Sequence, residues 1–277
     1  MQDAFAHCEN LVCAGDKDRY LASLFAPTDR RAHLYALYAF NLEIARVCEL
    51  ARDPMAGEVR LQWWREAIAG TRPGEASAHP VAAALLETIV HRDLAVATLI
   101  DLIEARAFDL YDDSMPTLDA FAGYARQTSS GLIALCAQVL DPGHPDIAAL
   151  AGPAGVAYAV TGLLRAFPLH ASRRQLYLPA DLLERHGARL DDIFAGRTTP
   201  ALRAALAELR AYARGQLDAF TSRIAAMPPA TAPAFLPVAL VRPYLDRMER
   251  RGYDPFASPV EVAQWRRQWT LWRAARM

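Results

Sequence analysis

Apolar residues recur at intervals of three and four along nearly the whole chain, and this pattern constrains the fold more than any other feature of the sequence. Residues 81–111 illustrate it, with Leu85, Ile89, Leu102 and Ile103 on one stripe. Such spacing is typical of amphipathic α-helices, and no alternating run rich in β-branched residues stands out. The sequence therefore predicts an all-α protein of about ten helices.

Clusters of Pro, Gly and Asp interrupt the helical pattern. The interruptions fall at 27–28, 53–57, 71–80, 114–117, 141–146, 197–200, 227–233 and 252–259. Thr117 and Ser258 are of the residue types that begin helices, so we expect helices to start there. No interruption is long enough to separate two domains, so residues 1–277 are predicted to form a single domain.

The composition is typical of a soluble protein with a substantial apolar core. The chain has 277 residues, of which 53% are hydrophobic, and its formal net charge is −1. With no positive surplus, no overall field attracts the protein to nucleic acid. The four cysteines are scattered, and the N-terminus lacks a basic start followed by an apolar run. We therefore expect a cytoplasmic protein that does not bind nucleic acid.

Three segments are apolar enough to raise the question of a membrane. Residues 147–164 and 224–241 are uncharged and just reach the length of a membrane span, but both are predicted to be buried soluble segments. Near the C-terminus, Trp265, Trp269 and Trp272 follow helical spacing beside several arginines. Packing as the last helix of a bundle is the preferred interpretation, and contact with a membrane surface or a partner helix is the alternative.

Residues 155–179, GVAYAVTGLLRAFPLHASRRQLYLP, carry the most distinctive motif. They resemble the second acid-rich region of the squalene/phytoene synthase family, which reads roughly G-x-A-x-Q-L-T-N-I-L-R-D-V-x-E-D-x-x-R-G-R-x-Y-L-P. The matching residues are Gly155, Ala157, Thr161, Leu164, Arg165, Arg173, Tyr177, Leu178 and Pro179. The resemblance implies an isoprenoid synthase type helical bundle around a central cavity.

The resemblance extends over most of the chain. In the region of the family's first acid-rich motif, the matching residues are Tyr20–Ser23, Pro27, Arg31 and Ala36–Phe40. Shorter matches are Leu61–Glu66, Asp109–Leu110 and Ala234–Pro237. Because these motifs are specific and span about residues 8 to 257, the chain is identified as a member of the family.

Of the acids that bind metal in the family, the two acid-rich regions keep only one, Glu49. The D-D-x-x-D positions of the first region fall on Ala45, Arg46 and Glu49. The ligand positions of the second region fall on Gly162, Ala166 and His170. Mg²⁺ requires several oxygen ligands, which these residues do not supply. We therefore predict no metal site and no cofactor.

Two further features of the second region affect its shape. Pro168 is expected to bend or stop the helix that carries it. Gly162 and Ala166 remove side-chain volume from the scaffold, which predicts an apolar void that either collapses or holds an apolar ligand.

One branch of the family matches even these departures. Its eukaryotic members assist the assembly of respiratory complex I in mitochondria, and they read A-F-N-x-E-x-A and L-R-A-x-P-x-H-x-S-R-R. The corresponding residues here are Ala39–Ala45 and Leu164–Arg174. The resemblance implies a role in complex I assembly at the inner face of the energy-coupling membrane.

Seven residues are candidates for binding a ligand or a phosphate group. They are Asn41, Glu43, Arg165, His170, Arg173, Arg174 and Tyr177. In the family, arginines after the second region hold diphosphate, which suits the paired donors of a guanidinium; a solvated helix end or internal ion pairs are the alternative. His170 is interpreted as a polar plug, with general base as the alternative. Asn41 and Glu43 lie about 200° apart on a helix and cannot both face one ion.

The favoured hypothesis is a catalytically lapsed member of the family, without catalytic residues, that acts by binding complex I subunits or assembly intermediates. An active prenyl-diphosphate transferase is one alternative, with Mg²⁺ as cofactor and arginines supplying part of the lost charge. A carrier of an isoprenoid or lipid in the cavity is the other. A peripheral position at the inner membrane is the alternative to a purely cytoplasmic location.

Overall fold

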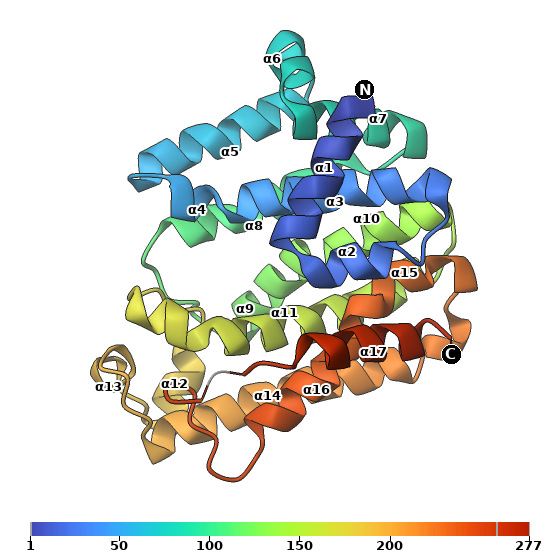
Figure 1. Cartoon of the computed structure of the whole chain (residues 1–277). Helices are drawn as coiled ribbons and strands as arrows, with labels where there is room; N and C mark the ends of the chain where they lie inside the picture. Colours follow the sequence, from blue (N-terminus) through green and yellow to red (C-terminus); the bar gives the residue numbers. More distant parts are fainter. Residues whose placement is uncertain (1, 259, 277) are drawn as a thin grey trace.

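The computed structural model describes residues 2–258 and 260–276, and these residues form helices and loops without a strand. The long helices lie side by side, with α5 and α7 at one end of the molecule and α14 at the other (Figure 1). The α-helices are α1 (Gln2–Gly15), α2 (Lys17–Ser23), α3 (Thr28–Ala45), α4 (Val47–Leu50), α5 (Pro54–Ile68), α6 (Pro73–Ala78), α7 (Pro80–Arg92), α8 (Val96–Ala107), α9 (Leu118–Ala125), α10 (Gly131–Leu140), α11 (Ile147–Ser172), α12 (Ala180–His186), α13 (Leu190–Phe194), α14 (Pro200–Thr221), α15 (Ala232–Phe235), α16 (Val241–Met248) and α17 (Gln264–Ala274).

Short segments of other helix types complete the bundle. The 3₁₀ segments are η1 (Phe108–Leu110), η3 (Ile224–Ala226), η4 (Pro229–Thr231) and η5 (Leu236–Leu240), and η2 (Arg126–Ser130) is one turn of π-helix. The all-α prediction is confirmed. The predicted number of about ten helices is too low, because many of the elements are a single turn or two and leave little periodic signal.

The predicted helix boundaries are only partly right. Thr117 begins α9 as predicted, because its Oγ1 accepts a hydrogen bond of 3.1 Å from the N–H of Ala120. The break predicted at 71–80 contains α6, whose Pro73 occupies the first helical turn, where proline is favoured. The start predicted at Ser258 is wrong, since its N–H closes a turn onto Asp254 at 2.8 Å and α17 begins at Gln264. Pro259 lies outside the described residues.

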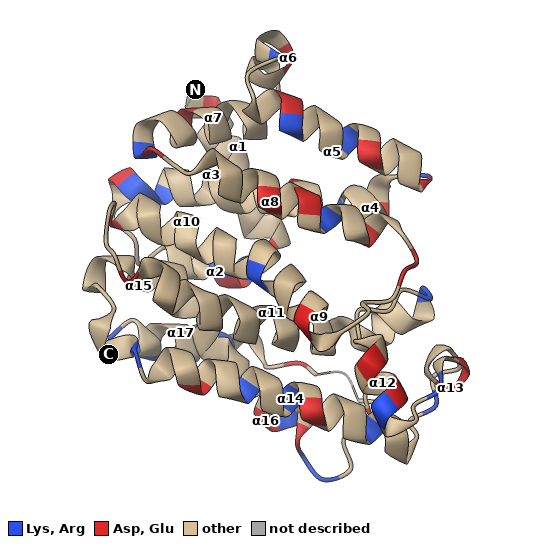
Figure 2. Ribbon diagram, turned by 180° about the vertical axis from the view of Figure 1, so that it is seen from behind, with Lys and Arg blue, Asp and Glu red and all other residues tan. Residues whose placement is uncertain are grey.

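The centre of the molecule is built on α3 and α11. Residues 34–41 of α3 are all buried, so this helix has core contacts on every side. α11 lies between α10 and α14 and runs through both Pro153 and Pro168. Pro168 was expected to bend or stop the helix, and the stop is wrong, because the helix continues to Ser172. Figure 2 shows α10 and α11 almost without charged residues, as expected for helices inside a bundle.

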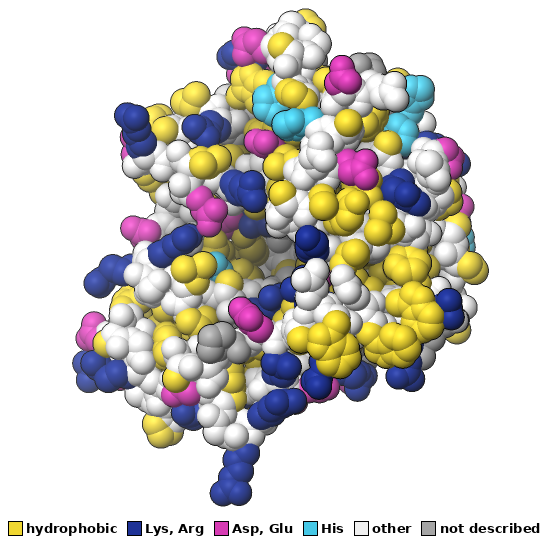
Figure 3. Space-filling model, viewed as in Figure 1, with side chains coloured by type: hydrophobic (Ala, Val, Ile, Leu, Met, Phe, Trp, Pro, Cys, Tyr) yellow, Lys and Arg dark blue, Asp and Glu magenta, His cyan; other side chains and the backbone are white. Residues whose placement is uncertain are grey.

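The two uncharged segments that were predicted to be buried lie mainly inside the bundle. α11 is the one described helix that is long and apolar enough to cross a membrane, and 56% of its most apolar window is buried against other helices. Residues 224–240 form η3, η4, α15 and η5 and are mostly buried from Thr231 onward, but the prediction is wrong for η3, whose residues are exposed. The space-filling view shows a hollow near the middle of the molecule (Figure 3), which agrees with the expected central cavity.

The C-terminal helix packs in a way that the sequence did not indicate. α17 buries Leu271, which is 1% exposed, against the bundle. Trp265, Trp269 and Trp272 are 63%, 57% and 36% exposed. α17 thus packs on the bundle as its last helix, as the preferred interpretation had it, but through Leu271 and not through the tryptophans. The aliphatic side of the helix meets the core, and the aromatic side faces solvent.

Candidate functional site

The first acid-rich region forms the end of α3 and the short helix α4. Asn41 is buried, and its Oδ1 has no hydrogen-bond partner in the described part of the chain. Glu43 is half-buried, and its charge raises the pKa of Cys8 in α1 and opposes the lowering of the pKa of His79, which precedes α7. A buried acceptor without a donor is unfavourable, so a polar ligand at Asn41 stays a prediction.

The second acid-rich region lies on α11 and borders a pocket of about 460 Å³. Gly162 and Ala166 line this pocket from α11, and Phe256 and Val260 line it from the segment before α17. A side chain at Gly162 would meet no atom within 4 Å. The volume that these two small residues leave has therefore not collapsed, and the pocket walls are mainly apolar.

A magnesium site does not fit the residues present. Among residues 2–258 and 260–276, no group of three or more His, Cys, Asp or Glu side chains is placed to hold a metal ion. At the positions that carry the family's ligands, Gly162, Ala45 and Ala166 offer no side-chain oxygen, and Arg46 carries a positive charge. A hard divalent cation needs several oxygen ligands, and this set does not provide them.

The one acid that remains at those positions is paired with an arginine from the other region. Glu49 of α4 accepts a hydrogen bond of 3.1 Å from Nη1 of Arg173, which follows α11. Both side chains are about half exposed. The two regions, 124 residues apart in sequence, are thus joined directly by an ion pair. Metal ions would bridge carboxylates to substrate phosphates at such a place in a working synthase.

The other two candidate arginines contact aromatic rings. The guanidinium of Arg165 lies 3.7 Å from the ring centroid of Tyr244 on α16. Arg174 adopts a left-handed conformation with φ of 58°, and its guanidinium lies 5.1 Å from the ring of Phe194 on α13. Their partners lie on different helices from the partner of Arg173. Phosphate binding by these arginines stays a prediction.

His170 and Tyr177 lie together at the edge of a buried polar cluster. Their rings are 4.7 Å apart. Burial lowers the pKa of His170 below its ordinary value, although the charge of Asp109 acts in the opposite direction. His170 is therefore a neutral imidazole near pH 7. No nucleophile is recognisable beside it, which fits a polar plug better than a general base.

Asp109 is the centre of that cluster and is buried. Its Oδ1 accepts hydrogen bonds of 2.8 Å from the hydroxyls of Tyr124 and Tyr177, and its Oδ2 accepts one of 2.9 Å from Arg106. Arg106 also donates to the hydroxyl of Tyr124 at 2.8 Å. The sequence singled out Asp109 only as an isolated family match. Its partners could not be identified locally, because Tyr124 and Tyr177 come from α9 and from the segment after α11.

The environment of the cluster fixes its protonation. Burial, together with the nearby acid Asp109, raises the pKa of both tyrosines well above the ordinary value, so both remain hydrogen-bond donors. Burial alone would lower the pKa of Arg106, but Tyr124 and Asp109 outweigh this effect and raise it. The cluster thus contains an ion pair between Arg106 and Asp109, and the hydrogen bonds of both tyrosines and of the carboxylate are made within it. It joins η1, α9 and the segment after α11 without offering a free nucleophile.

A second largely buried arginine, also not identified from the sequence, lies on α2. Arg19 bonds Asp16 at 3.0 Å, and its guanidinium lies 5.4 Å from the ring of Tyr38 and 5.2 Å from the ring of Tyr158. These contacts connect α2 with α3 and α11. Arg19 therefore has internal partners on all three elements and holds the N-terminal helices against the centre of the bundle.

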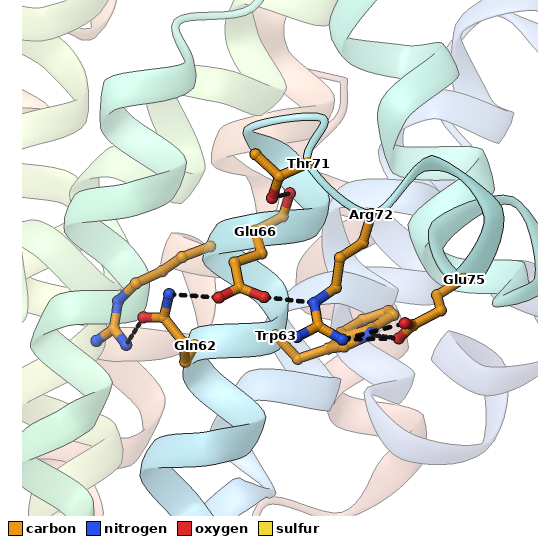
Figure 4. A network of polar contacts seen from close by, with 7 residues as sticks. Gln62, Trp63, Glu66, Thr71, Arg72 and Glu75 are labelled. Carbon is orange, nitrogen blue, oxygen red and sulfur yellow. Dashed lines mark hydrogen bonds and ion pairs between the residues drawn. The ribbon is translucent and has the colours of Figure 1, made fainter.

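The family match at residues 61–66 forms a surface network between α5 and α6 (Figure 4). Glu66 accepts hydrogen bonds from Gln62, at 2.9 Å, and from Arg72. Arg72 also donates to Glu75 at 3.0 Å, and the indole N–H of Trp63 donates to the same carboxylate at 2.9 Å. Each polar group bonds another group of the network, so we interpret it as the attachment of α6 to α5.

Comparison with known proteins gives relatives along the whole chain. A sequence profile described as squalene/phytoene synthase matches residues 12–273. The rat protein "NADH dehydrogenase (ubiquinone) complex I, assembly factor 6" is 30% identical over 256 residues, which cover 92% of this chain and 76% of the rat protein. The human protein of the same name is 28% identical, covering 90% and 75%. A phytoene synthase from Arthrospira platensis is 24% identical, covering 97% and 91%.

Solved structures agree with these relatives. The squalene synthase HpnC from Alicyclobacillus acidocaldarius has a TM-score of 0.80 and 26% identity, covering 92% of this chain and 96% of that one. A dehydrosqualene synthase in complex with a ligand has a TM-score of 0.86 at 19% identity, covering 99% and 96%, which supports the fold alone. The predicted isoprenoid synthase type bundle is confirmed, and the chain belongs to the squalene/phytoene synthase family.

Proposed function

We propose that this protein is a catalytically lapsed member of its family that acts by binding, in the assembly of respiratory complex I. The ion pair between Glu49 and Arg173 carries this proposal. It joins the last acid of the first region to an arginine of the second, so both groups already have a partner. The relatives named as complex I assembly factor 6 support the choice of process.

The chemistry of prenyl condensation supports the loss of catalysis. The reaction releases a diphosphate, whose developing charge must be neutralised in the transition state. Metal ions held by acid clusters supply that charge, and the residues present do not fit such a cluster. Arg165 and Arg174, the other two candidate arginines of the second region, rest on aromatic rings. Two arginines whose guanidinium groups rest on rings of different helices are a weak substitute for several metal ions.

The proposed partners are complex I subunits or assembly intermediates. We place the protein in the cytoplasm, acting peripherally at the inner membrane where such a complex is built. The pocket beside Gly162 and Ala166 is the proposed position for any prenyl or lipid ligand, since it is mainly apolar.

The test is a deletion strain scored for two outcomes at once. Membranes are assayed for NADH:quinone oxidoreductase activity and for assembled complex I on native gels, and squalene and carotenoids are measured in the same cells. We expect loss of complex I with unchanged isoprenoids, and recovery when the wild-type gene is returned. Normal complex I together with lost isoprenoid products would overturn the proposal in favour of an active transferase.

A charge swap provides the matched control. Arg173→Glu and Glu49→Arg each place like charges together, and the double variant restores an ion pair of reversed polarity. If the pair connects the two regions in place of metal, each single variant should lose function in cells and the double variant should regain much of it. Loss in Arg173→Glu and in the double variant, with function kept in Glu49→Arg, would mean that Arg173 itself contacts an acidic partner or phosphate.

Purified protein distinguishes the two alternatives. Incubation with farnesyl or geranylgeranyl diphosphate and Mg²⁺ should release no diphosphate, whereas an active phytoene synthase should do so in parallel. Turnover at an enzymatic rate would show the transferase, and a lipid that copurifies without turnover would show the carrier.

A further inference from the structure

Three exposed tryptophans form one side of α17. Trp265, Trp269 and Trp272 lie within about 60° of one another around the helix axis, and we call them the tryptophan face. The rings of Trp269 and Trp272 stack at a centroid distance of 4.8 Å. With Gln268, the three residues line an open apolar groove of about 450 Å³. Figure 3 shows hydrophobic side chains gathered over α17, with basic side chains along its lower edge.

The indole N–H groups of these tryptophans have no hydrogen-bond acceptor among the described residues. Within the described residues, no indole N–H of the tryptophan face donates a hydrogen bond to the protein, whereas Trp63 donates to Glu75. An indole has a large apolar body and one polar N–H, which suits an environment that is apolar on one side and wet on the other. The interface of a lipid bilayer is such an environment, and tryptophan is enriched there.

Arginines border the tryptophan face. Arg266 and Arg273 lie next to it around the helix, roughly 90° from Trp265, and the guanidinium of Arg276 lies 3.7 Å from the ring centroid of Trp272. Residues 262–276 contain no Asp or Glu. In the described part of the chain no carboxylate pairs with Arg266, Arg273 or Arg276. This surface is therefore locally positive on a protein whose net charge is −1.

The rest of α17 is fixed to the bundle. Arg267 bonds Asp18 of α2 at 2.8 Å, and Leu271 is buried beside η5. The tryptophan face is thus held outward by contacts on the opposite side of the helix. A surface that is already ordered loses less conformational entropy when it binds.

A second apolar surface adjoins the arginines. Thr270 and Ala274 of α17 line a pocket of about 470 Å³, whose other walls include Ile224, Phe235 and Leu236. Around the helix, Arg266 and Arg273 lie between this pocket and the tryptophan face. Cations bordered by apolar surface on both sides match the layout of a lipid, in which an anionic headgroup adjoins apolar chains.

We propose that the tryptophan face docks this protein on the surface of an anionic lipid bilayer, with Arg266 and Arg273 contacting lipid phosphates. A protein partner would need both an apolar groove and acidic groups in register, whereas an anionic bilayer presents both everywhere. The inference deepens the proposed place of action at the membrane. Vesicle binding by purified protein tests it separately from complex I assembly, so either proposal can fail alone.

The experiment measures sedimentation of the purified full-length protein with vesicles. One set contains phosphatidylcholine alone, and the other contains phosphatidylcholine mixed with phosphatidylglycerol. A basic residue near an anionic surface contributes roughly a fivefold gain in partitioning, so we expect binding at least about tenfold stronger to the anionic vesicles, weakening with added salt. Equal, weak sedimentation with both sets would overturn the proposal.

Two pairs of substitutions assign the surface. Trp265→Ser with Trp269→Ser is expected to reduce binding to anionic vesicles about tenfold or more. Its control is Met55→Ser with Val90→Ser, two residues that are 73% and 81% exposed on α5 and α7 and should not matter. Arg266→Gln with Arg273→Gln should remove most of the anionic preference, whereas Arg250→Gln with Arg251→Gln should retain it.

Circular dichroism and thermal unfolding check that each variant is folded. If the tryptophan variant is folded and sediments like wild type, the tryptophan face is not the docking surface. If wild type ignores anionic vesicles but the tryptophan variant fails to support complex I in cells, the face binds a protein, and the bilayer proposal is wrong.

Discussion

α11 and α17 use their apolar residues in opposite ways. α11 has the length and composition of a membrane span, yet the bundle surrounds it. α17 has only 11 residues, and four arginines lie between positions 266 and 276. This short, basic helix nevertheless presents three tryptophans to solvent. Length and mean hydropathy thus identify the helix that the core has already buried. The surface free to meet a membrane lies on the shorter and more basic helix.

The largest expected effect tests how tightly α11 is packed. A Cβ atom on Gly155 would lie 2.4 Å from the backbone of Ser130 in η2, and backbone cannot move aside easily. We expect Gly155→Val to lower the free energy of unfolding by about 4 kcal/mol or more, measured by urea denaturation. Gly162→Ala on the same helix meets open space and should stabilise by roughly 0.5–1 kcal/mol. Similar urea midpoints for the two variants would contradict the close approach.

Asp109 tests the polar part of the same interior. Asp109→Leu leaves Arg106 buried without its carboxylate, which is expected to cost about 3–5 kcal/mol of unfolding free energy. Tyr177→Phe removes one donor while Tyr124 and Arg106 still bond Asp109, so its cost should be about 1 kcal/mol. Thermal and urea unfolding measure both. A mild effect of Asp109→Leu would mean that the ion pair is not buried as described.

The third prediction compares the two sides of α17. Leu271→Ala removes the buried contact of this helix and should cost about 3 kcal/mol. Trp269→Ala removes a larger side chain from solvent and should cost about 0.5 kcal/mol or less. Urea denaturation of the two variants shows which side of α17 packs against the bundle. If Trp269→Ala proves the more destabilising, the aromatic side packs in solution and cannot serve as a docking surface.

Sequence patterns predicted those features that depend on neighbouring residues. Helical periodicity and the motif at 155–179 indicated the all-α bundle and its family, and Thr117 identified the start of α9. The sequence did not show where each break in the helical pattern ends, because a proline such as Pro73 can begin a helix as well as break one. Pro168 was misjudged since packing of α11 on both sides outweighs the loss of one hydrogen bond.

Features that depend on long-range contacts were not visible in the sequence. Tyr177 meets Asp109 across 68 residues, and Glu49 meets Arg173 across 124, and no local spacing encodes either pair. The orientation of α17 was missed for another reason. Its sequence has an aromatic side and an aliphatic position, Leu271, and amphipathicity alone does not say which of them the core accepts.

The smallest predicted effect uses pH to contrast the interior of the bundle with the tryptophan face. Burial lowers the pKa of His33 to about 4, and the neighbours Arg92, His91 and Arg30 act in the same direction. The unfolded chain, with a histidine pKa near 6.5, binds more protons between these values, so stability should fall as pH falls from about 6.5 toward 4. His79 and His170 are shifted in the same direction. After allowance for solvent screening, His33→Gln should lose about 1 kcal/mol less than wild type between about pH 7 and pH 5.

Urea unfolding of both proteins at the two pH values measures this difference, and parallel losses would show that His33 titrates normally in the folded state. The tryptophan face should behave differently over the same range, because arginine stays charged throughout. Binding to anionic vesicles should therefore be nearly constant between about pH 7 and pH 5, while the interior loses stability. A steep pH dependence of vesicle binding in the folded protein would instead point to a titrating histidine or carboxylate near α17.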